Sequence, residues 1–319
     1  MSIFTRTLNN LVIFKNDFTG HFIYTLFIIL ISSIVTYFIA QSLIGQKIGS
    51  FTSDFSKNSG STTMMLPNTK DDLYTERGSP YDNRTIGSQS ANVIFHGPRT
   101  KKQIALTFDA EMTDGMKAKL LSGVVKSSYD KRITDVLIQT NTKATFFLTG
   151  MWIELYPKET EEFSNNSLFE LGSHSYADTS YFGFCYGLKQ LSTTVRVEEI
   201  GATEKLLRKF GHIDNKLFRF PGGCYAPDDV KLANEANDTV VHWDVSGADG
   251  FNSNTNQIIR NVVDNVQNGS IIILHMNGEP TAPKTADALP EIIKQLKAKG
   301  YEFVKVNELL DLSPEIRSN

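Results

Sequence analysis

Hydrophobic and polar positions divide the chain into stretches of different character. Residues 22–44 (FIYTLFIILISSIVTYFIAQSLI) carry no charge, and as a helix they would extend about 35 Å, more than the ~30 Å hydrocarbon core of a bilayer. Ser, Thr, Asn, Gly and Asp dominate the next stretch, which has no sustained apolar period. We therefore predict a short N-terminal segment at 1–21, a transmembrane helix at 22–44, a flexible stalk at 45–90, a folded domain at 91–310 and a tail at 311–319.

Charges near the apolar stretch give little information about its orientation. Arg6 and Lys15 precede it, and Lys47 and Lys57 follow it, so the positive-inside rule is nearly balanced. A signal peptide usually has a shorter apolar region, and no convincing small-residue cleavage pattern follows this one. We expect a single-pass membrane protein with its N-terminus in the cytoplasm and the large domain outside, mainly because of the chemistry described below.

Alternating element types characterise the domain after residue 91. Amphipathic helical spacing occurs at 196–210, 256–266 and 288–300, and the last of these is closed by Gly300. Short apolar runs predict strands at 92–95, 103–108, 144–148, 167–171, 216–220, 239–243, 270–274 and 301–306. Strands alternating with helices indicate an α/β fold with a mainly parallel sheet, either doubly wound or a barrel. Seven or eight strands in some 220 residues favour the barrel.

The charge balance excludes one class of partner. The chain has 32 basic and 35 acidic residues, a net charge of −3, and 40% hydrophobic residues. No basic patch stands out, so we expect no nucleic-acid binding. The oligomeric state does not follow from the sequence.

Rare polar residues gather at the C-terminal ends of the predicted strands. In a parallel barrel these ends open onto one face, where active sites form. In LTFDAEMTDG, Asp109 and Glu111 would share one face of an extended chain. One such residue could be a solvated strand end, but several together indicate a site. The residues at these ends are Asp109, His174, Arg219, Asp244, Asp249 and His275.

Five segments in this order resemble the five motifs of the polysaccharide deacetylase family (carbohydrate esterase family 4, the nodulation-protein-B homology domain). They are LTFDAEMTDG, ELGSHSYAD, FRFPGG, VHWDVSGADG and IIILHM, and the resemblance covers roughly residues 92–310. It implies a distorted (β/α) barrel that uses a metal to remove N- or O-acetyl groups from polysaccharides. With the predicted anchor and stalk, the expected substrate is cell-wall glycan, peptidoglycan first and chitin-like N-acetylglucosamine chains second.

The resemblance also implies roles for individual residues. Asp109 would be the general base, held ionised and oriented by Arg219. His275 would be the general acid that protonates the leaving amine, with Asp249 orienting its ring. The N–H near Gly222 would help to bind the oxyanion. Further oxyanion or substrate positions would be Trp243, Asp244, Leu274 and Tyr225.

Two positions depart from the ligand pattern of the family. The second of two adjacent aspartates in the first motif is Ala110 here, and the second histidine of the second motif is Asp178. Glu111 follows Ala110 directly, and Asp178 lies four residues after His174, so one helical turn would bring those two side chains to one face. We therefore predict a divalent metal bound by Glu111, His174 and Asp178, with zinc first and cobalt or manganese as alternatives.

The replaced ligands keep other functions open. A barrel that has lost catalysis could serve as a glycan-binding module, although the retained acid–base residues favour an enzyme. A deacylase of a non-carbohydrate amide is a third hypothesis, because related folds host other C–N hydrolases.

The two cysteines, Cys185 and Cys224, are too few for a disulfide scaffold and lack a structural zinc spacing. Each follows a segment that resembles a family motif, which would bring both near the catalytic face. An oxidising exterior would permit a disulfide between them. The sequence leaves this pairing open.

Overall fold

The structure is a computed structural model, and it describes residues 93–211 and 216–312. Among these residues no helix is both long enough and apolar enough to cross a membrane. The predicted segments at 1–21, 22–44 and 45–90 lie outside the described residues, as does most of the tail. Their assignments therefore remain predictions.

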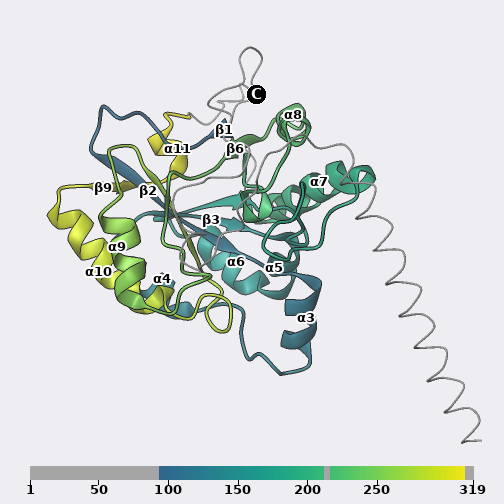
Figure 1. The fold of residues 1–319 in the computed structure, drawn as a ribbon, viewed down its shortest axis with the longest axis horizontal. Helices are drawn as coiled ribbons and strands as arrows, with labels where there is room; N and C mark the ends of the chain where they lie inside the picture. The colour runs from purple at the N-terminus through teal and green to yellow at the C-terminus, as the bar shows by residue number, and fades with distance from the viewer. Residues whose placement is uncertain (1–92, 212–215, 313–319) are drawn as a thin grey trace, which may run out of the picture. The chain divides into compact units, whose positions relative to one another are not determined.

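The sheet is wholly parallel between its named strands and curls into a half-barrel (Figure 1). Its hydrogen-bonded order is β1-β6-β5-β4-β3-β2-β8-β7, and β9 pairs with the start of β2 on the edge opposite β8, the edge that β3 also uses. The strands are β1 (Val93–Ile94), β2 (Gln103–Ala110), β3 (Ala144–Leu148), β4 (Phe169–Ser173), β5 (Leu217–Phe218), β6 (Thr239–Val241), β7 (Val245–Ser246), β8 (Ile271–His275) and β9 (Glu302–Val304). An antiparallel bridge between His96 and Ser270 joins the segment after β1 to the start of β8. The predicted parallel α/β sheet is confirmed.

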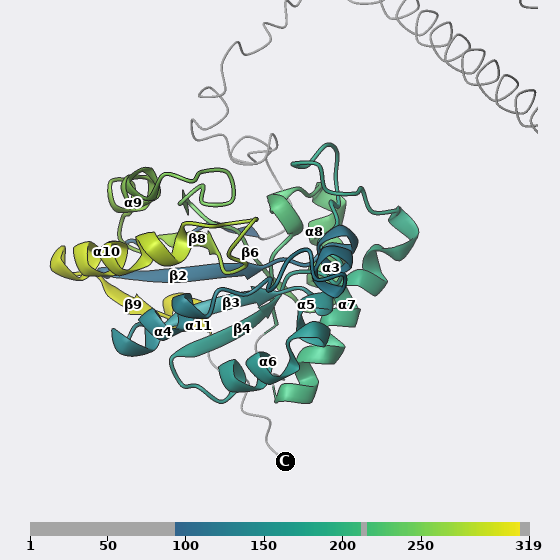
Figure 2. The same cartoon turned by 90° about the horizontal axis from the view of Figure 1, so that it is seen from below.

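Helices surround the strands, and α9 and α10 lie side by side (Figures 1 and 2). The helices are α3 (Asp114–Leu121), α4 (Lys131–Gln139), α5 (Gly150–Leu155), α6 (Pro157–Ser164), α7 (Arg196–Leu207), α8 (Pro227–Glu235), α9 (Thr255–Val263), α10 (Thr285–Ala298) and α11 (Val306–Leu309). Side-chain caps begin several of them; Asn254 accepts from the backbone of Gln257 at the start of α9. Gly300 adopts φ +81° after α10, as expected of a residue that ends a helix.

The two faces of the curled sheet contact different parts of the core. In β2, Leu106 and Phe108 pack with residues of α9 and α10 in the outer core. Ala105 precedes Leu106 and points to the opposite face, where it packs with residues of β3, β8 and β9 inside the curl. Because side chains alternate along a strand, Asp109 shares the inner face with Ala105 and Thr107. This alternation directs the Asp109 carboxylate into the curl rather than toward the helices.

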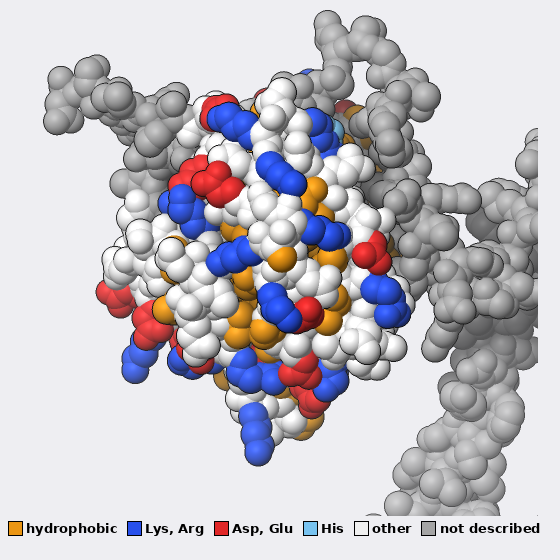
Figure 3. Space-filling model, turned by 90° about the vertical axis from the view of Figure 1, so that its left-hand side faces the viewer, with side chains coloured by type: hydrophobic (Ala, Val, Ile, Leu, Met, Phe, Trp, Pro, Cys, Tyr) orange, Lys and Arg blue, Asp and Glu red, His pale blue; other side chains and the backbone are white. Residues whose placement is uncertain are grey.

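The surface over the side of α9 and α10 has a mixed character. Figure 3 shows basic and acidic side chains interspersed there, with hydrophobic side chains visible between them. Charges of both signs alternate on this face, so it presents no broad field of one sign.

Candidate active site and metal centre

Sheet register brings the candidate residues together at one end of the strands. Asp109 of β2 lies opposite His275 of β8. Ser173 of β4 lies opposite Phe218 of β5, so the residues that follow them, His174 and Arg219, are also neighbours. Asp109, His174, Arg219, Asp249 and His275 thus converge at the C-terminal ends of parallel strands as predicted, whereas Asp244 does not.

Asp109 and Arg219 form a buried ion pair. Asp109 Oδ1 accepts from Arg219 Nη1 at 2.7 Å, and the same nitrogen donates to Thr107 Oγ1 at 2.9 Å. The guanidinium also donates to the carbonyl oxygens of Val241 and His242, at 3.3 and 3.2 Å. Burial alone would raise the pKa of Asp109, but Arg219, His174 and His275 together outweigh burial and hold the pKa below its ordinary value. Asp109 is therefore a carboxylate in a fixed orientation.

Three side chains beside this pair could hold a metal ion. Ligand atoms of Glu111, His174 and Asp178 all lie within 4.8 Å of one another. His174 Nδ1 contacts the Arg219 carbonyl oxygen at 3.0 Å; because a carbonyl can only accept, Nδ1 carries the proton and Nε2 presents its lone pair. Burial lowers the pKa of His174, which favours the neutral form that binds metals.

Two of these ligand atoms are buried without a hydrogen-bond partner among the residues that the structure describes. They are His174 Nε2 and Asp178 Oδ1, which lie 3.8 Å apart. Asp109 Oδ2 lies 3.6 Å from the same nitrogen. Burial, together with the charges of Glu111 and Asp109, raises the pKa of Asp178 well above its ordinary value. Converging buried lone pairs without donors are costly, and a divalent cation would relieve that cost, so the residues fit a metal.

Asp178 reaches the site by a route that the sequence did not predict. The expected helical turn between His174 and Asp178 is wrong, because this segment is an irregular loop and Asp178 has φ +49°. Glu199 of α7 holds the loop by accepting from the backbone N–H groups of Tyr176 and Ala177, each at 3.1 Å. The loop therefore owes its shape to a distant carboxylate rather than to helical hydrogen bonds.

Asn277 positions Glu111, and sequence reasoning missed it. Its Oδ1 accepts from Glu111 N at 3.1 Å, and its Nδ2 donates to Glu111 O at 2.7 Å and to Ser128 O at 3.3 Å. These bonds extend the pairing of the chain past the end of β2. The available signal was a polar residue directly after IIILHM, a segment otherwise apolar up to its histidine.

His275 lies beside the candidate metal site, with its Nε2 3.4 Å from Glu111 Oε1. Its Nδ1 is 2.9 Å from Asp249 Oδ1, and its backbone N donates to Asp249 Oδ2 at 2.7 Å. Thr285, also missed by the sequence, donates to the same Oδ2 at 2.5 Å. Burial lowers the pKa of His275, but Asp249 and Glu111 overcome this and raise the pKa well above its ordinary value. The ring is therefore held in the protonated form that a general acid needs.

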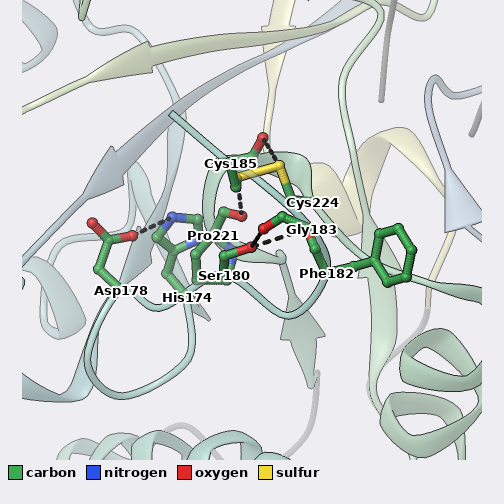
Figure 4. The surroundings of a disulfide bond; sticks show 9 residues. His174, Asp178, Ser180, Phe182, Gly183, Cys185, Pro221 and Cys224 are labelled. Carbon is green, nitrogen blue, oxygen red and sulfur yellow. Dashed lines mark hydrogen bonds and ion pairs between the residues drawn. A yellow bond between two sulfur atoms is a disulfide. The ribbon is translucent and has the colours of Figure 1, made fainter. Parts of the chain in front are cut away.

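Gly222 lies in a short 3₁₀ turn, Pro221–Gly223, that directly follows Arg219 and Phe220. It adopts φ +59°, and a Cβ there would lie 2.4 Å from Cys185 Sγ, so only glycine fits. Cys185 and Cys224 form the disulfide that the sequence left open. Figure 4 shows this disulfide close to Pro221, with the Asp178 side chain directed at the imidazole of His174.

Trp243 is the one further predicted substrate residue that lies next to the catalytic groups. The Arg219 guanidinium is 5.5 Å from the centre of its ring, which stacks on His242 at 3.9 Å. Burial lowers the pKa of His242 to about 4, so this histidine is a neutral packing partner.

Three predicted substrate residues are placed elsewhere by the structure. Asp244 lies at the start of β8, where it accepts from Ile271 N at 2.8 Å and pairs with Arg99 at 2.6 Å. Leu274 alternates with His275 along β8, so it points to the outer face and is fully buried in the core. Tyr225 is 2% exposed and belongs to a second core cluster. These three residues are corrected from substrate contacts to structural positions.

Known proteins share this fold and its motifs. The family model for polysaccharide deacetylases matches residues 96–241. A peptidoglycan-N-acetylglucosamine deacetylase of Bacillus cereus is 31% identical over 221 residues, covering 69% of this chain and 73% of that protein. The structure of the Bc1960 peptidoglycan N-acetylglucosamine deacetylase aligns with a TM-score of 0.59 at 29% identity, covering 71% of this chain and 95% of that one.

A CE4 family pseudoenzyme from Bacillus anthracis shares the fold, with a TM-score of 0.56 at 24% identity and 70% of each chain covered. The motifs, the register that joins them and the relatives at these levels of identity agree. The chain therefore belongs to the polysaccharide deacetylase family, hydrolases that act on carbon–nitrogen bonds other than peptide bonds.

Proposed function

We propose that the protein is a metal-dependent deacetylase that removes N-acetyl groups, with O-acetyl groups as the alternative, from cell-wall glycan, peptidoglycan first. One observation carries the proposal. The unpartnered atoms His174 Nε2 and Asp178 Oδ1 converge beside an ionised carboxylate, Asp109, and a protonated imidazole, His275. The names of the bacterial relatives support peptidoglycan as the substrate.

Each residue has a defined part in this proposal. Asp109, held by Arg219 through Oδ1, keeps Oδ2 directed at the space beside His174, where it would take a proton from the attacking water. His275, oriented by Asp249, would deliver a proton to the nitrogen of the leaving amine. The N–H near Gly222 would donate to the oxyanion.

The metal would be held by Glu111, His174 and Asp178. When bound, a divalent ion supplies Lewis-acid activation of water and of the acetyl carbonyl. One imidazole and two carboxylates suit zinc, and the oxygen-rich set also suits manganese or cobalt.

Acetate release from purified peptidoglycan and from N-acetylglucosamine oligomers tests the proposal. We expect activity that a chelator removes and that Asp109→Asn lowers by about 10²–10⁴-fold, the usual contribution of a general base. Asp244→Asn is the matched control, because Asp244 lies in a motif-like segment but at the other end of the strands. Full activity of Asp109→Asn would contradict the mechanism.

A glycan-binding module without catalysis is the second candidate. It is favoured by Ala110 and Asp178, which stand at the positions of the usual aspartate and histidine ligands. Metal analysis of the purified full chain separates the two candidates. Bound metal together with acetate release supports the enzyme. No bound metal, and no activity after zinc, cobalt or manganese is added, supports the binding module.

The proposal places the domain outside the cell, anchored by residues 22–44. The disulfide between Cys185 and Cys224 supports an oxidising location. Protease treatment of intact cells tests the orientation. Degradation of the domain before cell lysis is expected, and protection of the domain until lysis would contradict it.

A further inference from the structure

Two large aromatic side chains lie exposed against each other near the candidate active site. Tyr186 is 65% exposed and Phe251 is 56% exposed. Their ring centres are 5.1 Å apart and the ring planes are tilted by 49°. Tyr186 belongs to the loop between β4 and α7, and Phe251 to the loop between β7 and α9. Folding thus brings together two apolar rings from distant segments and leaves them largely in water, which is an unusual use of aromatic surface.

The pair lies between two parts of the catalytic machinery. On one side, a Cβ placed on Gly222 would lie 3.2 Å from Tyr186 Cδ2. On the other, Phe251 directly follows Gly250, where a Cβ would lie 3.5 Å from His275 Cε1. The two rings therefore border the site between the turn proposed to bind the oxyanion and the proposed general acid.

The loop that carries Tyr186 is held in a defined conformation. Leu188 N donates to Cys185 O at 2.8 Å, and the central residues Tyr186 and Gly187 have φ values of +48° and +83°, as in a type I′ turn. A tyrosine with positive φ is uncommon. The disulfide from Cys185 to Cys224 ties this turn to the segment after Gly222. Tyr186 is thereby preorganised, which lowers the entropic cost of binding.

We propose that Tyr186 and Phe251 form an aromatic platform on which a pyranose ring of the glycan stacks, beside the sugar that carries the acetyl group. The inference rests on the proposed function and names how that site binds a polymer. A pyranose ring presents C–H groups on its faces and hydroxyl groups at its edge. Exposed aromatic rings match such faces, because they offer apolar area at low conformational cost.

Binding of the N-acetylglucosamine tetramer to the full chain in detergent, measured by isothermal titration calorimetry, tests the platform. We expect Tyr186→Ala to weaken the affinity about tenfold, equivalent to about 1.4 kcal/mol, and Tyr186→Phe to retain it. Phe184→Ala is the control, because Phe184 is a 94% exposed aromatic of the same loop outside the pair. In acetate release, Tyr186→Ala should raise KM for the tetramer and change kcat by less than about twofold.

The outcomes separate this inference from the proposed function. Tetramer binding that depends on Tyr186, without acetate release by the wild type, supports the platform and overturns the deacetylase. Acetate release with equal KM in the wild type and Tyr186→Ala supports the deacetylase and overturns the platform. Equal losses of affinity from Phe184→Ala and Tyr186→Ala would assign the effect to the loop in general and also overturn it. A wild type that does not bind the tetramer overturns the platform as well.

Discussion

Buried carboxylates occur at both ends of the parallel strands, but the groups that surround them differ between the two ends. At the N-terminal end, Glu170 accepts from Thr145 Oγ1 at 2.8 Å and from Asn307 N at 3.3 Å. Asp244, which is partly exposed, is likewise paired with Arg99 and with the backbone of Ile271. At the C-terminal end, His174 Nε2 and Asp178 Oδ1 lie 3.8 Å apart, and neither meets a donor within residues 93–211 and 216–312. Buried acidic groups thus occur at both ends, and an imidazole lone pair that faces carboxylates distinguishes the candidate site.

A pair of carboxyl groups at the N-terminal end, Asp238 and Glu204, resembles the candidate site in its burial. Asp238, just before β6, and Glu204 of α7 are two neighbouring buried carboxyl groups, and Asp238 Oδ1, Asp238 Oδ2 and Glu204 Oε1 have no hydrogen-bond partner among the described residues. Lys216 Nζ lies 2.8 Å from Glu204 Oε2 and supplies a countercharge. A proton on Asp238 would let the two carboxyl groups form a hydrogen bond with each other. At the candidate site, in contrast, the lone pair of His174 Nε2 also faces the carboxylates. Burial, followed by Glu204, raises the pKa of Asp238 to about 9.

Arg219→Met should give the largest effect. It leaves Asp109 as a buried, uncompensated charge, so we expect a loss of about 3–5 kcal/mol in the free energy of unfolding together with loss of acetate release. Arg99→Met is the matched control, because the pair with Asp244 is partly exposed and should cost about 1 kcal/mol or less. Urea denaturation measures both. Equal losses in the free energy of unfolding for Arg219→Met and Arg99→Met would contradict the proposed difference between the two ends of the strands.

Asp178→Asn should uncouple stability from metal binding. It removes a buried carboxylate that faces Glu111 and Asp109, so the metal-free protein should melt at an equal or higher temperature than the wild type. Zinc affinity should fall by about 100-fold or more, since loss of supporting residues around a metal alone costs about 10–100-fold. Competition with a chromophoric chelator measures the affinity. Unchanged affinity would remove Asp178 from the ligand set.

Asp238→Asn should flatten the pH dependence of stability. Because the folded pKa is raised to about 9, the contribution of Asp238 is fully present below its unfolded pKa of about 4. It is lost as pH rises toward 9, while the unfolded state ionises. Between pH 5 and pH 9 the wild type should therefore lose stability relative to the variant, by up to roughly 1.4 kcal/mol per pH unit.

Thermal unfolding at pH 5, 7 and 9 measures this difference. Lys231→Gln is the control, because Lys231 lies on the exposed face of α8, where its ion pair with Glu235 is at 3.9 Å. A difference between Asp238→Asn and the wild type that stays constant with pH would contradict the shared proton.

Thr285→Val should give the smallest effect. It removes the hydrogen bond to Asp249 Oδ2, worth about 1 kcal/mol, and so should lower kcat by roughly fivefold with KM unchanged. Thr142→Val, at another buried threonine, should lower stability without changing kcat. A loss confined to stability in both variants would show that Thr285 does not position the Asp249–His275 pair.

Much of the fold and the acid–base set followed from local patterns. The strand at 103–108, the helix closed by Gly300 and the placement of Asp109, Arg219 and His275 at strand ends were all predicted. Period-two alternation and helical spacing are properties of neighbouring residues, so they can be recognised without a structure. The family motifs then implied roles for individual side chains, because acid–base and metal-binding properties depend first on the residue type.

The errors and omissions have a common physical cause. Asp244 and Leu274 lie beside candidate site residues in the chain, but register directs Asp244 to the other end of the sheet and alternation directs Leu274 to the other face. The residues that sequence reasoning missed contact partners that are distant in the chain: Asn277, Thr285 and Tyr186. No local sequence pattern identifies contacts of that kind.

Residue identity and spacing therefore settled the fold class, the ionisable groups and the strand end where they gather. Tertiary structure alone decided that an irregular loop held by Glu199 brings Asp178 to His174, and that the Cys185–Cys224 disulfide forms. The reason is that local periodicity depends on covalent neighbours. The direction of a lone pair, and whether a donor meets it, depends on every segment that packs around it.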